Sequence, residues 1–499
     1  MRLSLKRSAW LWMVLVLLLA VLPGGRRINS LTFTRDETWT LMTAGARNYG
    51  PYTLSQVLEV QQRLAPDQAF GWDLLINRQG AVAGWNTVSV RAWSFFFGLL
   101  ALAMVYRAGR HMFGQQTGVG ACLLLLGSSL FIQYFHISRA FTPVVFFSSL
   151  LLFAYWRVAI GGRPHDRLGQ ASLLAGGIGL LYSHYFGALL IPALGLFHLL
   201  FVRKDRRWWL TSLLFLLILL AALPELTVLH RGVEHNVSRY AASRPGMDVA
   251  ETLERLAFAL TNGIIRWPGR LDTVLLLFLP LAMLTLTRTR SRHAASLSPA
   301  WFLGFTALVF FLLVMGVNHF VPVLMTTRIR YLLALWPPLA LLTAAGIAQL
   351  AGGGQQRVAD WLLAGLVVSG IAVQLVTPYY LPHDYHEKSI VHLADQALMK
   401  SAQPDDFLIL SREALPSDKL NRDYYLHVWE FPREVITGEA DLGLLDQMAL
   451  PHSRFWVLAP ERDGDIEQRV QEALRFCRRP VDRGDLVLTL YARSDADCA

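Results

Sequence analysis

The chain carries little charge. Only 16% of its 499 residues are Asp, Glu, Lys or Arg, whereas soluble globular domains carry about 25%. It has three cysteines, too few for a disulfide framework or a cysteine-based metal site. It also lacks an HExxH motif, an internal repeat and, in its polar tail, a glycine-rich phosphate loop. These absences exclude a disulfide scaffold and argue against an ordinary soluble domain.

Hydrophobic residues take the place of the missing charge. They make up 54% of the chain, and the mean hydropathy is +0.38. The formal net charge is +10, but the basic residues form short clusters between apolar runs, as the loops of membrane proteins do. We therefore predict a polytopic α-helical membrane protein with no nucleic-acid partner.

Apolar runs recur along the first three quarters of the chain, and a spanning helix needs about 20 such residues. The first run, Ala9–Leu22, follows basic residues and precedes LPGGRR, which has no small-residue cleavage site, so we predict an uncleaved span. We expect about eleven transmembrane helices in all. The others are predicted near 90–106, 118–134, 141–160, 171–184, 186–202, 209–229, 271–287, 299–317, 331–350 and 360–377.

Arginine and lysine in the connectors set the predicted orientation. With the N-terminus in the cytoplasm, the connectors YRAGRHMFG, WRVAIGGRPHDR, VRKDRRWW, RTRSRH and GGGQQRVAD all lie inside, and all carry basic residues. Basic residues also occur in the predicted outer segments 24–89 and 230–270, but long loops follow this rule poorly. We predict a multi-pass protein of the cell (inner) membrane with an extracytoplasmic C-terminus.

The tail differs from the rest of the chain. Strand-like pieces DFLILS (406–411), RFWVLAP (454–460) and LVLTLYA (486–492) alternate with helical stretches at 386–400 and 465–476. This alternation predicts a small extracytoplasmic α/β domain over 381–499, appended to a transmembrane domain over 1–380. Cys477 and Cys498 lie in this tail, and the sequence leaves open whether they pair.

The stretch TRDETW (34–39) places two acids in the predicted first outer loop, 24–89. Thr34 and Glu37 have the spacing of a capping box, and acids in a first helical turn complement the helix dipole. This structural interpretation accounts for Glu37. Asp36 is one acid more than a cap requires, so a chemical role for it stays open.

Three further outer segments carry polar residues: QYFHISRAFTP (133–143), YSHYFG (182–187) and NHFVPVLMTTRIRY (318–331). Arg139 could anchor a short loop at the interface or hold a phosphate, because guanidinium matches phosphate oxygens as a fork. Arg328 and Arg330 could snorkel to lipid headgroups or, being basic on the outside, meet an anion. His184 could mark only a polar kink between two spans.

The order of these segments resembles the GT-C superfamily of integral-membrane glycosyltransferases, and within it the dolichyl-phosphate-mannose–protein mannosyltransferase-like branch that includes lipid A aminoarabinose transferases. Four stretches carry the resemblance over residues 5–380: RDETWTLMTAGA, HISRAFTP, YSHYFGALLIP and RIRYLLALWPPLALLTAAGI. The tail is similar to the outer α/β domain that such proteins often append.

The resemblance implies transfer of a sugar from a polyprenyl-phosphate carrier to a glycan, lipid or protein acceptor on the outer face, with inversion. It implies that Asp36 is the general base. It further implies that Arg139, Arg328 and Arg330 bind the donor phosphate. His136, His184, Tyr185 and Tyr331 would line the donor pocket. No cofactor is required, and a divalent metal is not indicated.

A polytopic transporter or flippase for lipid-linked sugars is the competing interpretation. Transporters often show inverted repeats and ionisable residues at mid-membrane depth. Here no repeat is found, and the polar residues gather toward the outer ends of the spans. These features favour glycosyl transfer.

Overall fold

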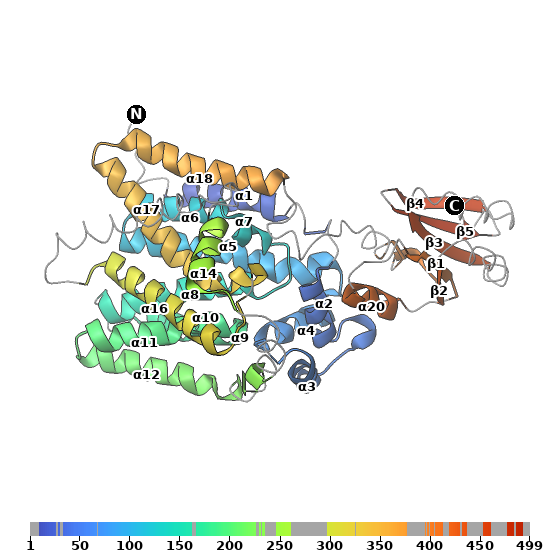
Figure 1. Cartoon of the computed structure of the whole chain (residues 1–499), viewed down its shortest axis with the longest axis horizontal. Helices are drawn as coiled ribbons and strands as arrows, with labels where there is room; N and C mark the ends of the chain where they lie inside the picture. The colour runs from blue at the N-terminus through green and yellow to red at the C-terminus, as the bar shows by residue number, and fades with distance from the viewer. Residues whose placement is uncertain are drawn as a thin grey trace. The chain divides into compact units, whose positions relative to one another are not determined.

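In the computed structural model the chain forms two compact units, and Figure 1 labels its helices and strands. Unit 1 comprises Met1–Ile28, Thr53–Arg78 and Val90–His383, and unit 2 comprises Asn29–Tyr52, Gln79–Ser89 and Asp384–Ala499. The residues described are 9–25, 28–29, 33–66, 68–161, 166–225, 229–230, 232–234, 246–260, 297–324, 326–376, 395, 397–398, 400–403, 405–412, 419–429, 432–436, 453–460, 477–483 and 486–492.

Unit 1 is built from apolar helices, many of which lie side by side in Figure 1. Within the described residues, five helical segments are long and apolar enough to cross a membrane: Thr87–Met112, Phe141–Ile160, Arg206–Glu225, Pro299–Phe320 and Arg328–Gly352. They correspond to α5 (Thr87–Met112), α8 (Phe141–Tyr155) with its π-helical end Trp156–Ile160, α12 (Arg206–Ala221) with the residues after it, α16 (Pro299–Phe320), and the end of η3 (Thr326–Leu335) with α17 (Trp336–Gly352).

Unit 1 contains further helices among its described residues. They are α1 (Ala9–Gly25), α3 (Leu54–Leu64), α4 (Gly71–Ala83, which continues into unit 2), α6 (Gln115–Leu126), α7 (Ser129–Gln133), α9 (Arg167–Ser183), α10 (Tyr185–Ala188), α11 (Leu190–Phe201), α14 (Val249–Leu260) and α18 (Gln356–Val376).

Small residues at close contacts and hydrogen bonds between side chains hold these helices together. A Cβ on Gly176 of α9 would lie 2.9 Å from the backbone nitrogen of Leu151 in α8, so glycine allows the two backbones to approach closely, as in other membrane bundles. The Trp336 indole donates to Ser128 Oγ at 2.8 Å and links α17 to the break between α6 and α7.

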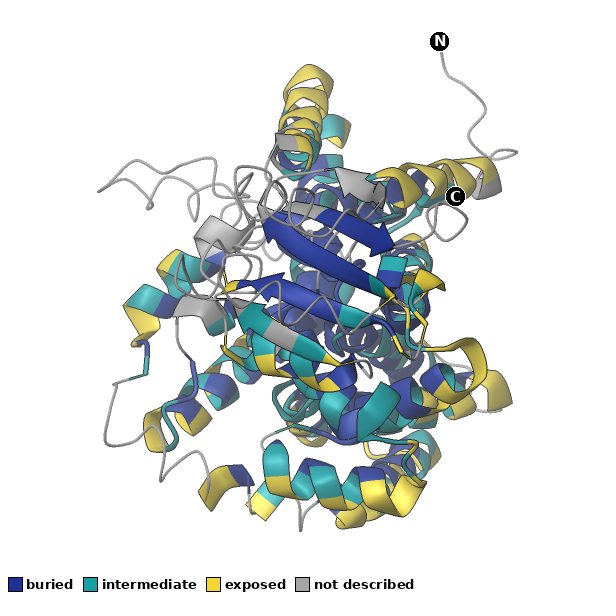
Figure 2. Cartoon of the chain, turned by 90° about the vertical axis from the view of Figure 1, so that its right-hand side faces the viewer, coloured by how far each residue is buried: buried dark blue, intermediate teal, exposed yellow. Residues whose placement is uncertain are grey.

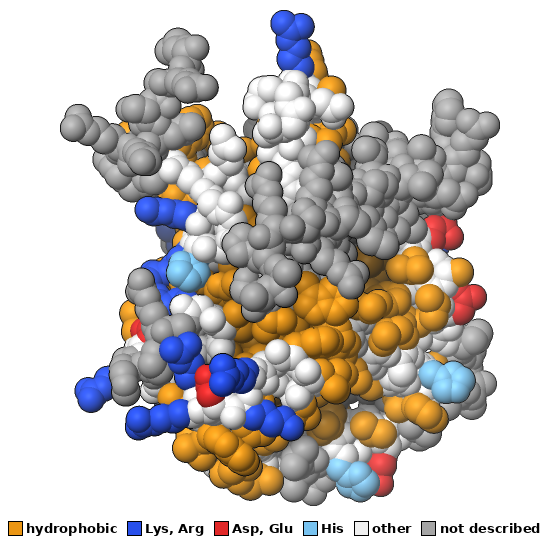
Figure 3. Space-filling view, turned by 90° about the vertical axis from the view of Figure 1, so that its left-hand side faces the viewer, with side chains coloured by type: hydrophobic (Ala, Val, Ile, Leu, Met, Phe, Trp, Pro, Cys, Tyr) orange, Lys and Arg blue, Asp and Glu red, His pale blue; other side chains and the backbone are white. Residues whose placement is uncertain are grey.

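The outer surface of unit 1 carries exposed apolar side chains, and Leu216 and Leu220 of α12 are about half exposed. Such side chains suit contact with lipid, and Figure 3 shows a broad apolar surface with Lys and Arg beside it.

The length and apolar character of these helices support the prediction of a membrane protein, and their ends differ from some of the predicted spans. The predicted span 118–134 is interrupted, because Gly127 ends α6 and Ser128 caps α7. Within the predicted span 209–229, the described helical segment ends at Glu225. The span predicted at 271–287 lies outside the described residues. The total of about eleven spans therefore stays a prediction.

Unit 2 contains a five-stranded mixed sheet in the order β2-β1-β3-β5-β4. Strand β1 pairs in parallel with β2 and β3, whereas β5 pairs antiparallel with β3 and β4. Five consecutive residues of β3, from Phe455 to Ala459, are buried, and strands of the sheet are dark blue, the colour of buried residues, in Figure 2. Because side chains alternate between the two faces of a strand, this run is buried on both faces. The strands are β1 (Phe407–Ser411), β2 (Arg433–Ile436), β3 (Arg454–Pro460), β4 (Cys477–Arg483) and β5 (Leu486–Ala492).

The strands predicted at 406–411, 454–460 and 486–492 are confirmed as β1, β3 and β5. The sequence did not reveal β2 and β4, which are the two edge strands. Strand β4 reads CRRPVDR, and charge and proline are tolerated at a sheet edge but hide the usual alternation. The helix predicted at 465–476, Cys498 and the side chain of Cys477 lie outside the described residues.

Candidate active site

The acidic motif of unit 2 begins helix α2 (Arg35–Ala44), and its cap is the one that the sequence predicts. The Thr34 backbone N–H donates to Glu37 Oε2 at 2.8 Å, and the Glu37 backbone N–H donates to Thr34 Oγ1 at 3.2 Å. Glu37 is fully buried, and its carboxylate takes part in the cap by accepting the Thr34 N–H. Asp36 lies in the first turn and is only half-buried, which leaves it in reach of solvent or a ligand.

The end of α2 is fixed by residues of the tail, within unit 2. Gly45 ends the helix in the left-handed conformation at φ 76°. Arg47, itself left-handed at φ 49°, forms two hydrogen bonds of 2.7 Å to the two carboxylate oxygens of Asp395. Burial alone lowers the pKa of the Arg47 guanidinium, but Asp395 outweighs it and raises that pKa. The Arg47 guanidinium therefore stays charged, and its two hydrogen bonds to Asp395 anchor the chain just after the acidic motif.

The Asp395 carboxylate is further held by tail aromatics. The Trp429 indole donates to Asp395 Oδ1 at 2.9 Å. Helix α20 (Lys419–Val428) contacts α2, and its Tyr424 stacks on Tyr49 with ring centroids 6.0 Å apart. These contacts make the acidic motif part of the same packed unit as the tail.

In unit 1, the predicted donor-binding residues gather around His184. This residue lies in the connection between α9 and α10, caps α10 with its ring nitrogen and has the Tyr331 ring at 4.7 Å. Burial lowers the pKa of His184, and the positive charges of Arg139, Arg330 and Arg328 lower it further. His184 is therefore held neutral. The three arginines lie close enough to act on one imidazole, so the structure brings together cations from two distant segments.

Aromatic rings line this cationic group. The Arg328 guanidinium lies 5.8 Å from the Tyr331 ring centroid, and the Arg330 guanidinium lies 5.6 Å from that of Phe141. Such cation–π contacts orient a guanidinium, and Arg328 also donates a hydrogen bond to the Val323 backbone oxygen at 3.4 Å. Tyr331 also stacks on Phe186 at 5.2 Å. The arrangement, which we call the arginine cluster (Arg139, Arg328 and Arg330), suits an anionic group attached to an apolar chain.

The other two predicted pocket residues are His136, three residues before Arg139, and Tyr185, which follows His184. His136 is buried in the loop that carries Arg139. The Tyr185 hydroxyl donates to Glu225 Oε2 at 2.7 Å, and Glu225 is only 3% exposed. Asp73, which is also buried, lies near enough to Glu225 for the two carboxylates to interact.

The sequence analysis does not predict a role for Glu225, which lies within the predicted span 209–229, or for Asp73, which lies in the predicted outer loop 24–89 outside its acidic motif. Glu225 stands at the end of an apolar run, in the stretch LPELTV, and Asp73 follows FGW. An acid within a hydrophobic run is the signal that was available, since such residues need a buried partner.

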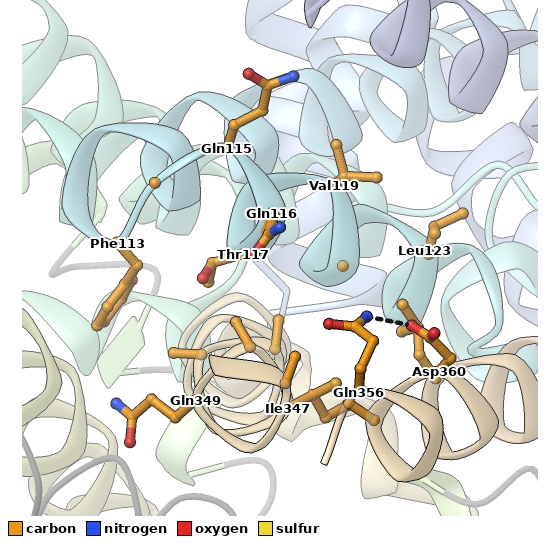
Figure 4. Close-up of a pocket in the computed structure, with 18 of the residues that line it drawn as sticks. Phe113, Gln115, Gln116, Thr117, Val119, Leu123, Ile347, Gln349, Gln356 and Asp360 are labelled. Atoms are coloured by element: carbon orange, nitrogen blue, oxygen red, sulfur yellow. Dashed lines mark hydrogen bonds between the residues drawn. The ribbon is translucent and has the colours of Figure 1, made fainter. Parts of the chain in front are cut away.

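A separate cavity of about 760 Å³ lies between α1, α6, α17 and α18 (Figure 4). Alanine, leucine and isoleucine side chains form much of its wall, and Gln356 donates to Asp360 at 2.8 Å on one side. Its lining includes Gln115 and Gln349, which adjoin connectors predicted to be cytoplasmic, and it includes none of the predicted site residues. We therefore place the candidate site at the arginine cluster.

One family model matches part of the chain, and several solved structures are similar to it in fold. Residues 67–229 match the family model of dolichyl-phosphate-mannose-protein mannosyltransferases. This stretch includes Arg139, His184 and Glu225, whereas Asp36 and Arg328 lie outside it. No curated protein matches the chain in sequence.

Among solved structures, ArnT from Cupriavidus metallidurans in the apo state is 14% identical, covers 99% of each chain and has a TM-score of 0.51. ArnT bound to undecaprenyl phosphate is 13% identical, with 98% of this chain and 99% of that chain covered and a TM-score of 0.51. The Archaeoglobus fulgidus oligosaccharyltransferase is 14% identical, with 98% and 74% covered and a TM-score of 0.48. At such identity the likeness to ArnT shows a shared fold. The family match and this fold confirm the resemblance to the GT-C superfamily of integral-membrane glycosyltransferases that the sequence motifs indicate.

Proposed function

We propose that this membrane protein transfers a sugar from a polyprenyl-phosphate donor to an acceptor on the extracytoplasmic face, with inversion at the anomeric carbon. The observation that carries the proposal is the arginine cluster: the Arg328 guanidinium lies 5.8 Å from the Tyr331 ring and the Arg330 guanidinium lies 5.6 Å from the Phe141 ring, and both rings lie against the His184 ring. Fixed positive charge is what a departing lipid phosphate requires. ArnT, which shares the fold, has been solved with undecaprenyl phosphate bound.

Asp36 is proposed as the general base. It is the acid of the motif that the cap does not use, and it lies in the first turn of α2, where the helix dipole favours an ionised carboxylate. An ionised carboxylate can accept the proton of an acceptor hydroxyl as the oxygen attacks the anomeric carbon. The bond from that carbon to the phosphate oxygen then breaks on the opposite side, and the polyprenyl phosphate leaves.

The leaving phosphate is already a weak base, so the donor needs little acid assistance. Arginines supply the positive charge that a divalent cation would otherwise provide. We therefore propose a metal-independent reaction, which predicts full turnover in the presence of excess EDTA. His136, His184, Tyr185 and Tyr331 are assigned to the donor pocket.

Replacement of Asp36 by Asn tests the proposal. The substitution keeps size and polarity but removes the base, so we expect Asp36→Asn to lose at least about 99% of transfer, given the 10²–10⁴-fold contribution of general bases. Purified protein is supplied with a mixture of polyprenyl-phosphate sugars, and product is measured by mass spectrometry. Binding of undecaprenyl phosphate should be unchanged, because the arginine cluster is intact.

Glu37→Gln is the matched control on the adjacent residue. Glutamine keeps an oxygen for the Thr34 N–H, so the cap should weaken by roughly 1 kcal/mol or less, with kcat nearly unchanged. Full transfer activity in Asp36→Asn, or equal loss in Glu37→Gln, contradicts the assignment of the base. Transport of intact lipid-linked sugar across vesicles without any transfer would instead support the flippase alternative.

A further inference from the structure

A short turn in unit 1, the 70–73 turn (Phe70, Gly71, Trp72 and Asp73), contacts both segments that flank the donor site. It precedes and begins α4 in the first outer loop. The Phe70 backbone N–H donates to Glu225 Oε1 at 3.3 Å, and the Trp72 indole donates to the backbone oxygen of Ser138 at 3.3 Å. Ser138 immediately precedes Arg139, so one turn reaches the end of α12 and the arginine loop together.

Glu225 extends this link to the pocket on its other oxygen. Its Oε2 accepts the Tyr185 hydroxyl at 2.7 Å, and Tyr185 immediately follows His184. One buried carboxylate therefore bridges the 70–73 turn to the connection between α9 and α10. Both oxygens of the Glu225 carboxyl group accept a hydrogen bond, one from the Phe70 N–H and one from the Tyr185 hydroxyl, and these two contacts fix the orientation of the group.

Close contacts with Tyr182 restrict the position of the 70–73 turn. A Cβ on Gly71 would collide with the backbone oxygen of Tyr182, and the Phe70 ring packs edge-on to the Tyr182 ring at 5.1 Å. The Tyr182 hydroxyl donates to the backbone oxygen of Ala221 at 2.7 Å. The turn, the end of α9 and the end of α12 are therefore locked to one another.

The Arg139 backbone is fixed from its other side by α5. Ser94 Oγ lies 3.3 Å from both the backbone N–H and the backbone oxygen of Arg139, and the Thr142 hydroxyl donates to the Ser94 backbone oxygen at 2.7 Å. With Trp72 on Ser138, the loop is held at two consecutive residues.

We propose that Trp72 and Glu225 are positioning residues that fix Arg139 and the His184–Tyr185 connection at the spacing that a polyprenyl phosphate requires. Neither residue is assigned contact with the donor, and each acts through a neighbour: Trp72 through Ser138, and Glu225 through Tyr185. The inference rests on the proposed function, because it assumes that the arginine cluster receives the donor phosphate.

The test measures binding of undecaprenyl phosphate to the purified full-length protein, without turnover. Trp72→Phe keeps an aromatic ring but removes the indole N–H donor together with the five-membered ring, and Glu225→Ala removes both carboxyl contacts. We expect Kd to rise about threefold to tenfold in Trp72→Phe, as for loss of one hydrogen bond, and more in Glu225→Ala. In Glu225→Gln, the amide oxygen can still accept the Phe70 N–H, and the amide N–H₂ group can donate to the Tyr185 hydroxyl oxygen. We therefore expect this variant to recover much of the affinity for undecaprenyl phosphate.

Matched controls separate positioning from general damage. Trp361→Phe removes an indole N–H from an exposed tryptophan of α18, and Glu254→Ala removes an exposed carboxylate of α14; both should bind as the wild type does. Kd is determined on the folded, monodisperse fraction, so a loss of stability alone does not change it. Wild-type Kd in both Trp72→Phe and Glu225→Ala overturns the positioning role. If the wild-type protein itself fails to bind undecaprenyl phosphate, the proposed function fails instead.

Discussion

Charged residues of the same type differ in burial in this protein, and burial decides how strongly each can interact with a ligand. Glu37 is buried in a capping box, while Asp36, one residue earlier, is half-buried beyond it. Arg330 is 7% exposed against the Phe141 ring, whereas Arg110 at the end of α5 is exposed. Charge that is kept away from water interacts more strongly with an incoming phosphate than exposed charge does.

That difference yields a prediction for the arginine cluster. Arg139→Gln and Arg330→Gln should each raise the donor KM by about tenfold to a hundredfold, because a charged hydrogen bond to phosphate contributes about 1.5–3 kcal/mol. Steady-state kinetics with a polyprenyl-phosphate donor measure this directly. Arg110→Gln, which removes an exposed arginine, should leave KM unchanged. An unchanged donor KM in both cluster variants would argue against phosphate binding there.

At the scale of elements, α2 depends on residues far away in sequence. The Arg47–Asp395 pair joins positions 348 residues apart, and its side chains are only 10% and 2% exposed. Buried pairs of this kind cost much more to break than surface pairs, because the remaining charge is left without its partner. The acidic motif is therefore held by the fold of unit 2 as well as by its own cap.

Arg47→Ala should consequently lower the free energy of unfolding of unit 2 by roughly 3 kcal/mol or more. Limited proteolysis of the full-length protein, followed at sites in the tail, measures this opening. Arg422→Ala is the control, since Arg422 and Asp423 form a solvent-exposed pair at 4.0 Å and should contribute under about 1 kcal/mol. Equal protease resistance of Arg47→Ala and the wild type would show that the buried pair is dispensable.

The elements also show what could be predicted from the sequence. The Thr34–Glu37 cap and strands β1, β3 and β5 follow from local spacing and hydrophobic runs, and the structure contains them. The arginines around His184 were expected as a group because their segments share an outer position. The bridge by Glu225 and the Arg47–Asp395 pair could not be predicted, because each depends on which distant segments the fold brings into contact.

At the scale of the whole chain, orientation in the membrane decides whether the proposed site can meet an outer-face acceptor. Five candidate spans among the described helices establish the membrane setting, and the positive connectors predict a cytoplasmic N-terminus. Lys204 stands in one such connector, between α11 and α12, while Val82 stands near the end of the first predicted outer loop. Both side chains are exposed, so single cysteines there would be accessible to a reagent on their own side.

Labelling in sealed right-side-out membrane vesicles tests this orientation. In a background with Cys477 and Cys498 replaced by Ser, the buried Cys122 should react little with a membrane-impermeant maleimide. Val82→Cys should then be labelled at once, and Lys204→Cys only after the vesicles are opened with detergent. The physical reason is that arginine- and lysine-rich short connectors stay on the cytoplasmic side. The reverse pattern would place the first loop and Asp36 in the cytoplasm, and an outer-face acceptor would then be out of reach of the proposed base.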